Sequence, residues 1–126
     1  MDIEKIKSDL TMESFFFSEC TVKRNDNIAS EKLKMNIEKH VSEIGDKYKV
    51  ELSFRITKDA NDLFVTVNAI AYFTIECDDI ELKKMVLEEN TVAIMFPFVR
   101  SQVAIMTSQP NMSPIIIPAI NTSKFK

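Results

Sequence analysis

The sequence predicts an α+β fold, in which a four-stranded antiparallel sheet is followed by C-terminal helices that pack on one of its faces. Apolar and polar residues alternate over four segments between residues 15 and 76. This alternation is typical of strands with one buried and one solvated face. Between residues 79 and 108 the apolar period becomes that of a helix. Strands followed by helices are typical of α+β proteins.

The length and the glycine content limit the kinds of site that this chain can hold. Its 126 residues are enough for one hydrophobic core, so we expect a single domain over residues 1–126. The chain contains one glycine, Gly45. Phosphate-binding loops, dinucleotide-binding turns and the nucleophile elbow of hydrolases each need several glycines, so these three kinds of site are excluded.

Charge and motif content favour a protein that is not an enzyme. The net charge of −3 provides no strongly basic face, so we expect no nucleic-acid partner. Cys20 and Cys77 form no C-x-x-C pair and are interpreted as small buried apolar groups. His40 stands alone on a polar face. With no triad and no metal-ligand cluster, we expect no catalytic residues, no metal and no cofactor.

The sequence also predicts a cytoplasmic protein without a membrane span. The first seven residues alternate charged and apolar side chains, unlike a signal peptide. The longest apolar run without proline, residues 92–96, is far shorter than the roughly 18 residues that a membrane-spanning helix needs.

The first strand is predicted from Phe15 to a turn at residues 24–27, after a short helix or flexible arm over residues 1–13. Strict alternation places Phe16 on one face with Cys20, and Phe15 and Phe17 on the other. The outward face is expected to carry Phe15 and Phe17. These rings must then be covered or remain as an exposed apolar surface.

The other three strands have a clearer pattern. The second ends at Gly45, the third spans residues 49–57, and the fourth spans residues 63–76. Short polar connections between them predict a meander, in which each strand pairs with the next. The residues expected to face inward are Leu33, Met35, Ile37 and Val41; Val50, Leu52, Phe54 and Ile56; and Leu63, Val65, Val67, Ala69, Ala71, Phe73 and Ile75.

The helical segment 91–108 carries two apolar stripes on opposite sides. The first consists of Val92, Met95, Phe96, Val99, Val103 and Met106, and the second of Ile94, Phe98 and Ile105. A helix that covers a sheet needs only one stripe. The second stripe is therefore covered by another subunit or a bound ligand, or else residues 110–125 fold back over it. Pro97 either kinks this helix or separates two shorter helices.

The final segment, residues 110–126, holds three of the four prolines and is predicted to be extended. Ile115, Ile116 and Ile117 lie between Pro114 and Pro118. Side chains alternate along an extended chain, so one of the three, Ile116, must point away from whatever the other two cover.

Two pieces of this region resemble the C-terminal half of the SecB family of protein-export chaperones. The first is Asn90 to Arg100, with a core formed by Phe96, Pro97, Phe98 and Arg100. The second contains Ile115, Pro118 and Asn121 at a similar distance downstream. The four preceding strands also agree with that family in order and length.

This resemblance implies a homotetramer, built as a dimer of dimers, that holds unfolded proteins without ATP. SecB-like proteins bind clients in hydrophobic grooves and deliver them to the translocase motor SecA, and related solitary members protect an antitoxin. From the residue pattern we expect clients to contact Phe15, Phe17, Phe98 and Ile115 to Ile117. The second helical stripe predicts a subunit interface at Ile94, Phe98 and Ile105, to which the resemblance adds Arg100.

Two alternatives remain open at the level of sequence. SecB-like proteins present an acidic sheet face to SecA, whereas the polar faces here mix Lys32, Lys34 and Arg55 with Glu38 and Glu51. A chaperone for a toxin–antitoxin pair is therefore one alternative to an export chaperone. A small oligomeric adaptor with one fixed protein partner is the other.

Overall fold

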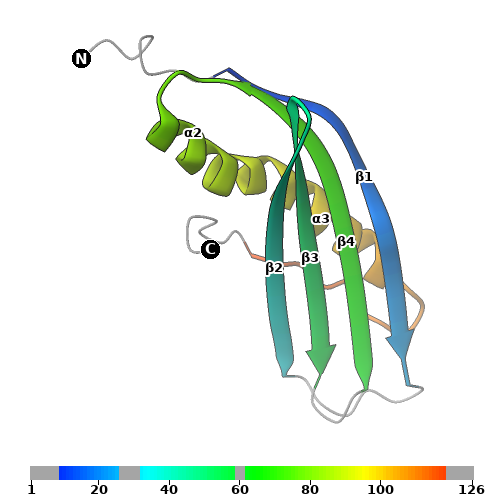
Figure 1. Cartoon of the computed structure of the whole chain (residues 1–126). Helices are drawn as coiled ribbons and strands as arrows, with labels where there is room; N and C mark the ends of the chain where they lie inside the picture. The colour runs from blue at the N-terminus through cyan, green and yellow to red at the C-terminus, as the bar shows by residue number, and fades with distance from the viewer. Residues whose placement is uncertain (1–8, 26–31, 59–61, 119–126) are drawn as a thin grey trace.

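A computed structural model describes residues 9–25, 32–58 and 62–118, and it confirms the α+β architecture (Figure 1). One antiparallel sheet forms one layer, and consecutive helical segments cross one face of it. We call that face the inner face. In chain order the elements are β1 (Asp9–Arg24), β2 (Leu33–Ile44), β3 (Lys47–Lys58), β4 (Leu63–Glu76), α2 (Ile80–Met85), η2 (Val86–Asn90, a π-helix) and α3 (Thr91–Thr107).

The strand order is β1-β4-β3-β2, so the predicted meander is wrong for β1. Strands β2, β3 and β4 do follow one another, with Gly45 in the left-handed region at φ 62° in the turn between β2 and β3. Strand β1 instead pairs with β4 along its whole length, from Asp9 opposite Glu76 to Arg24 opposite Leu63. This order places β4, whose inner face is apolar throughout, between two neighbours and buries it best.

Two bulges in β1 reverse the predicted orientation of its aromatic residues. The strand begins at Asp9, so residues 9–13 are strand and not a helix or arm, while residues 1–8 lie outside the described part. The register shifts between Met12 and Ser14 and again between Phe17 and Glu19. Each shift changes which face the next residue occupies. Phe15 and Phe17 therefore share the inner face with Cys20, and Phe16 points outward with 46 % of its surface exposed.

The core lies between the inner face of the sheet and α3. The inward residues predicted on β3 are buried, as are those on β4 from Leu63 to Phe73. The first stripe of α3 packs against them, with Val92, Met95 and Val99 fully buried and Phe96 near Phe54 at a ring-centroid distance of 6.4 Å. Edge positions are less covered, and Cys20, predicted to be buried, is exposed on the edge strand β1.

The helical layer begins at a side-chain cap and is tied to the sheet at two polar points. Asp79 accepts hydrogen bonds from the backbone N–H groups of Glu81 and Leu82. Lys83 of α2 lies over the ring of Tyr48, and a hydrogen bond to Tyr48 raises the pKa of this lysine. Lys39 of β2 donates to the backbone carbonyl of Glu88 in η2 at 2.8 Å. The helix then continues through Pro97 within α3, so the alternative of two helices separated at Pro97 is wrong.

After α3 the chain turns and returns along the helix as an extended segment, residues 112–118, which we call the strap (Figure 1). The turn includes a bridge between Gln109 and Met112, and Asn111 is left-handed at φ 62°. The hydroxyl of Thr107 accepts a hydrogen bond from the backbone N–H of Ile115 at 2.8 Å. Ile117 is buried in the core. Arg100 also donates to the backbone carbonyl of Ile117, so the strap is fixed by two polar contacts and by the burial of Ile117.

Replacing Thr107 with valine is expected to loosen the strap without changing the size of the side chain. The change leaves the Ile115 N–H without its acceptor, which should lower the free energy of unfolding by about 1–3 kcal/mol and speed hydrogen exchange at the Ile115 amide. Ser108→Ala is the matched control, because the Ser108 hydroxyl bonds only to the carbonyl of Ala104. Equal exchange at Ile115 in both variants would contradict this account.

Candidate functional site

The second stripe of α3 remains exposed within the chain. Ile94, Phe98 and Ile105 have 37 %, 48 % and 68 % of their surface exposed. We call these three residues the α3 stripe. The described part of the C-terminal segment does not cover them, because the strap packs on a different side of the helix, beside Arg100. Cover by residues 110–118 is thus ruled out, and residues 119–126 lie outside the described part.

An aromatic cluster extends the α3 stripe onto the sheet. The ring of Phe98 lies 5.0 Å from that of Phe15, and Phe15 meets Phe17 edge to face at 5.2 Å. Phe15 and Phe17 are half-buried and pack against the core. The bulges in β1 make this cluster possible, because strict alternation would have turned both rings to the other face. The predicted contact residues Phe15, Phe17 and Phe98 therefore do come together.

A second apolar surface lies where the strap meets α3. A cleft of about 320 Å³ is lined by Pro97, Arg100, Ser101, Ala104, Ile116 and Ile117. We call it the α3–strap cleft. Alternation orients the three isoleucines as predicted: Ile116 has 69 % of its surface exposed, Ile117 is buried at 3 %, and Ile115 is partly buried. Of the three, only Ile116 is largely exposed.

Arg100 holds the strap against the helix. Its Nε atom donates to the backbone carbonyl of Ile117 at 2.8 Å, and the side chain is half-buried. This is a contact within the chain. The interface role predicted for Arg100 stays a prediction, as do the client contacts predicted for Ile115 and Ile117.

The inner face of the edge strand β2 also exposes apolar side chains. Leu33 and Met35 lie on the helix-covered side of the sheet, opposite Lys58 and Ile56, and have 47 % and 45 % of their surface exposed. No other described strand pairs with the far edge of β2.

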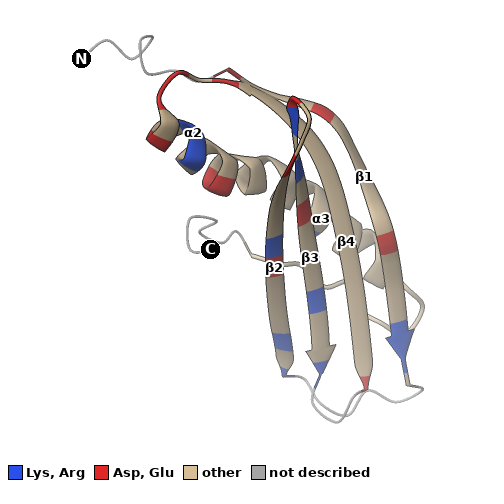
Figure 2. Ribbon diagram, viewed as in Figure 1, with Lys and Arg blue, Asp and Glu red and all other residues tan. Residues whose placement is uncertain are grey.

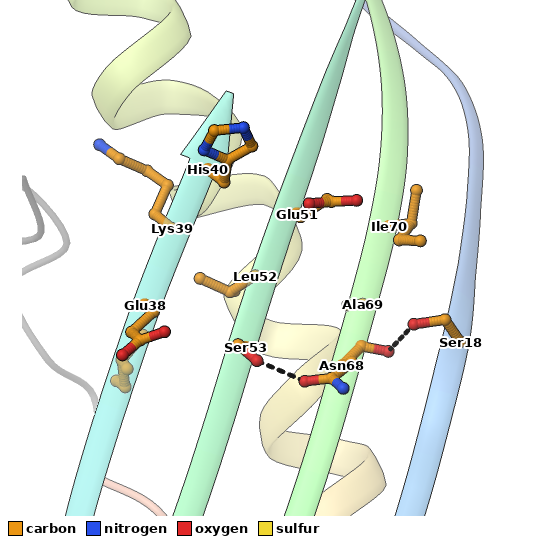
Figure 3. Close-up of a pocket in the computed structure, with 11 residues that line it drawn as sticks. Ser18, Glu38, Lys39, His40, Glu51, Leu52, Ser53, Asn68, Ala69 and Ile70 are labelled. Atoms are coloured by element: carbon orange, nitrogen blue, oxygen red, sulfur yellow. Dashed lines mark hydrogen bonds between the residues drawn. The ribbon is translucent and has the colours of Figure 1, made fainter. Parts of the chain in front are cut away.

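The outer face of the sheet has a polar depression of about 560 Å³, shown in Figure 3. Asn68 joins three strands there: its side chain bonds to Ser53, its amide donates to Glu19 at 3.0 Å, and its backbone carbonyl accepts from Ser18 at 3.4 Å. Elsewhere on this face Lys49 lies 3.1 Å from Glu51, and that hydrogen bond raises the pKa of Lys49. These polar groups mainly bond to one another, so the depression is a network across three strands.

Charges are distributed unevenly along the helical layer. Figure 2 shows Lys, Arg, Asp and Glu on the strands, on α2 and on the turns that follow α2, whereas α3 has a single charged residue, Arg100. Among the described residues there is no cluster of three potential metal ligands. The described helices include none that is both long and apolar enough to cross a membrane.

Sequence reasoning missed three features of this region. The bulges in β1 leave no mark in the pattern of apolar residues. In the sequence, Lys39 is indistinguishable from the other polar residues of its strand. In the structure it lies on the inner face and donates a hydrogen bond to η2. The hydroxyl of Thr107 accepts a hydrogen bond from the strap only because of the path that the chain takes after α3. A threonine at the last residue of a helix, followed by a proline-rich segment, is the only local signal for it.

Comparison with known proteins identifies structures with the same fold but finds little sequence similarity. No protein-family model matches the chain. An uncharacterized protein of Methanocaldococcus jannaschii, MJ0357, is 31 % identical over 61 residues, which are 48 % of this chain and 39 % of that protein. The chain thus matches well under half the length of this curated relative.

Two solved structures share the architecture. One is the SecB-like chaperone Rv1957 of Mycobacterium tuberculosis, in complex with a peptide from the HigA1 antitoxin; the TM-score is 0.72 at 10 % identity, over 88 % of this chain and 87 % of that one. The other is a protein of unknown function from Streptococcus agalactiae, with a TM-score of 0.52 at 8 % identity, over 90 % and 99 % of the two chains. The four-stranded sheet with α3 across its inner face is therefore a SecB-like fold.

Proposed function

We propose that this protein is a SecB-like chaperone, which holds non-native chains on apolar surfaces without ATP and has no enzymatic activity. The observation that carries the proposal is the exposure of large apolar side chains at two places, the α3 stripe and Ile116 of the strap. The described part of the chain covers neither of them. Large exposed apolar surfaces mark sites of interaction with other proteins. The likeness of the fold to a chaperone bound to an antitoxin peptide supports the same function.

The proposal assigns different roles to the two apolar surfaces. The α3 stripe is the subunit interface of a homotetramer, a dimer of dimers, in which Phe15 and Phe17 extend the contact. The α3–strap cleft, Ile116 and the inner edge of β2 bind the client. Support for this division comes from shape, since the α3 stripe lies along one long helix while Ile116 projects from a strap. The strap costs little entropy to order, because Pro114 and Pro118 stiffen it.

The resemblance to SecB-like proteins implies two kinds of client. Unfolded preproteins delivered to SecA in the cytoplasm are one, and an antitoxin is the other. The mixed charges of the outer face favour the antitoxin, since an acidic face for SecA is missing. The antitoxin peptide bound to the structural neighbour in M. tuberculosis also favours it. An adaptor with one folded partner would need the same exposed surface but would not accept several unfolded proteins.

The direct test of the proposal is suppression of aggregation. The purified protein is expected to prevent aggregation of several unrelated proteins diluted from denaturant, and added ATP should make no difference, because one glycine cannot form a phosphate-binding loop. Light scattering measures the outcome. A requirement for nucleotide, or protection of a single protein only, would contradict the chaperone and favour the adaptor.

The interface assignment predicts that two charges on the α3 stripe separate the subunits. Each covered isoleucine contributes about 1.5–3 kcal/mol to association, so Ile94→Asp plus Ile105→Asp should yield folded monomers in light scattering coupled to size exclusion. Ile44→Asp plus Ile80→Asp is the matched control, since it adds the same charges at other exposed isoleucines. A monomeric wild-type protein would contradict the interface.

The client assignment predicts a different result for Ile116→Ser. Assembly mass should stay the same, while the affinity for an unfolded client falls about tenfold or more, as expected when 1.5–3 kcal/mol of apolar contact is lost. Fluorescence anisotropy with a labelled unfolded protein measures this change. Ile80→Ser removes an exposed isoleucine on α2 as a control. If Ile116→Ser dissociates the subunits, Ile116 belongs to the interface and not to the client site.

A further inference from the structure

Arg100 is the only charged residue between Thr91 and Pro118. Both walls of the α3–strap cleft come from this stretch, so the cleft has one cation and no acidic residue. An arginine side chain has five N–H donors in a planar fork. Among the described residues, only Nε of Arg100 has a hydrogen-bond partner, the carbonyl of Ile117. In the part of the chain that the structure describes, no carboxylate lies within ion-pair distance of Arg100.

The surroundings of Arg100 strengthen the attraction between its remaining N–H donors and an anion. The guanidinium is half-buried, and three of its neighbours in the cleft, Pro97, Ala104 and Ile116, are apolar. Water screens a charge less in such a place than on an open surface. The bond to Ile117 also fixes the plane of the fork. A fixed, partly desolvated guanidinium is well suited to bind a carboxylate through two parallel hydrogen bonds.

Arg24 at the end of β1 is bonded in a similar way. It donates to the carbonyl of Asn111 at 3.1 Å and to the carbonyl of its neighbour Asn25 at 3.2 Å. A carbonyl group satisfies a donor but does not cancel the charge of a guanidinium, so the bond to Ile117 leaves the charge of Arg100 available to an anion.

We propose that the α3–strap cleft recognises an acidic side chain that accompanies an aliphatic one in the client. The aliphatic side chain enters the cleft against Pro97, Ala104 and Ile116, and the Asp or Glu carboxylate binds the two Nη groups of Arg100. The two client residues stand at positions i and i+2, because these share a face of an extended chain. This inference rests on the proposed function and specifies which client segments it selects.

The test uses labelled peptides whose two ends are blocked. They share one alternating apolar segment and differ at a single position, which is Glu, Gln or Lys. At low salt the Glu peptide should bind the wild-type protein about tenfold more tightly than the Gln peptide, as expected for a hydrogen-bonded ion pair in place of a neutral contact. The Lys peptide should bind most weakly. The advantage of Glu should shrink as salt is added.

Arg100→Gln shows whether the arginine acts directly. The variant should bind the Glu peptide no better than the Gln peptide, because the preference is lost in addition to any loss that loosening of the strap causes for both. Equal losses for both peptides would mean that Arg100 acts only by holding the strap, and the proposal would fall. Ile116→Ser is the control, because it should weaken both peptides while the tenfold preference remains. A change in assembly mass in Arg100→Gln would assign this residue to the interface and also overturn the proposal.

Failure of this inference is distinguishable from failure of the proposed function. Glu, Gln and Lys peptides that bind equally would overturn the inference alone. If no peptide binds and unfolded proteins aggregate freely, the chaperone function itself is wrong. A Gln peptide with a free C-terminus that binds as tightly as the blocked Glu peptide would show that the cleft binds a C-terminal carboxylate instead of an acidic side chain.

Discussion

The structure depends on how α3 packs, because a single helix can place only one side against a sheet. The buried stripe that includes Val92, Met95 and Val99 closes the core over β3 and β4. The opposite side carries Ile94, Phe98 and Ile105, and the described part of the chain has no second layer to cover them. Residues that would form a buried seam in a larger domain are therefore left exposed. This constraint explains why a chain of ordinary composition exposes so many large apolar side chains.

The elements around α3 decide which apolar residues are left exposed. The bulges of β1 bring Phe15 and Phe17 to the helix side and join them to Phe98. On the other flank the strap buries Ile117, presents Ile116, and is held by Arg100 and Thr107. The result is two apolar surfaces separated by the helix. One suits a long contact between like subunits, and the other suits a short extended segment.

Much of the fold could be predicted from sequence because it depends on local periodicity. Alternation identified the buried side of β3 and β4, and helical spacing identified both stripes of α3. The position of β1 beside β4 could not be predicted, because strand order depends on pairing between distant residues. The orientation of Phe15 was predicted wrongly, since one extra residue in a bulge reverses a face and adds no signal. The outward direction of Ile116 was predictable, whereas its place beside Arg100 required the path of the strap.

The central claim is that another protein chain covers the α3 stripe, and side-chain oxidation by hydroxyl radicals tests it most directly. The reactivity of Phe98 should be low in the assembled protein and should rise on dilution, as the subunits separate. Phe54 is buried and should stay protected at every concentration, while Phe16 is exposed on the outer face and should stay reactive. A Phe98 that reacts like Phe16 at all concentrations would contradict the account, because the stripe would then be uncovered.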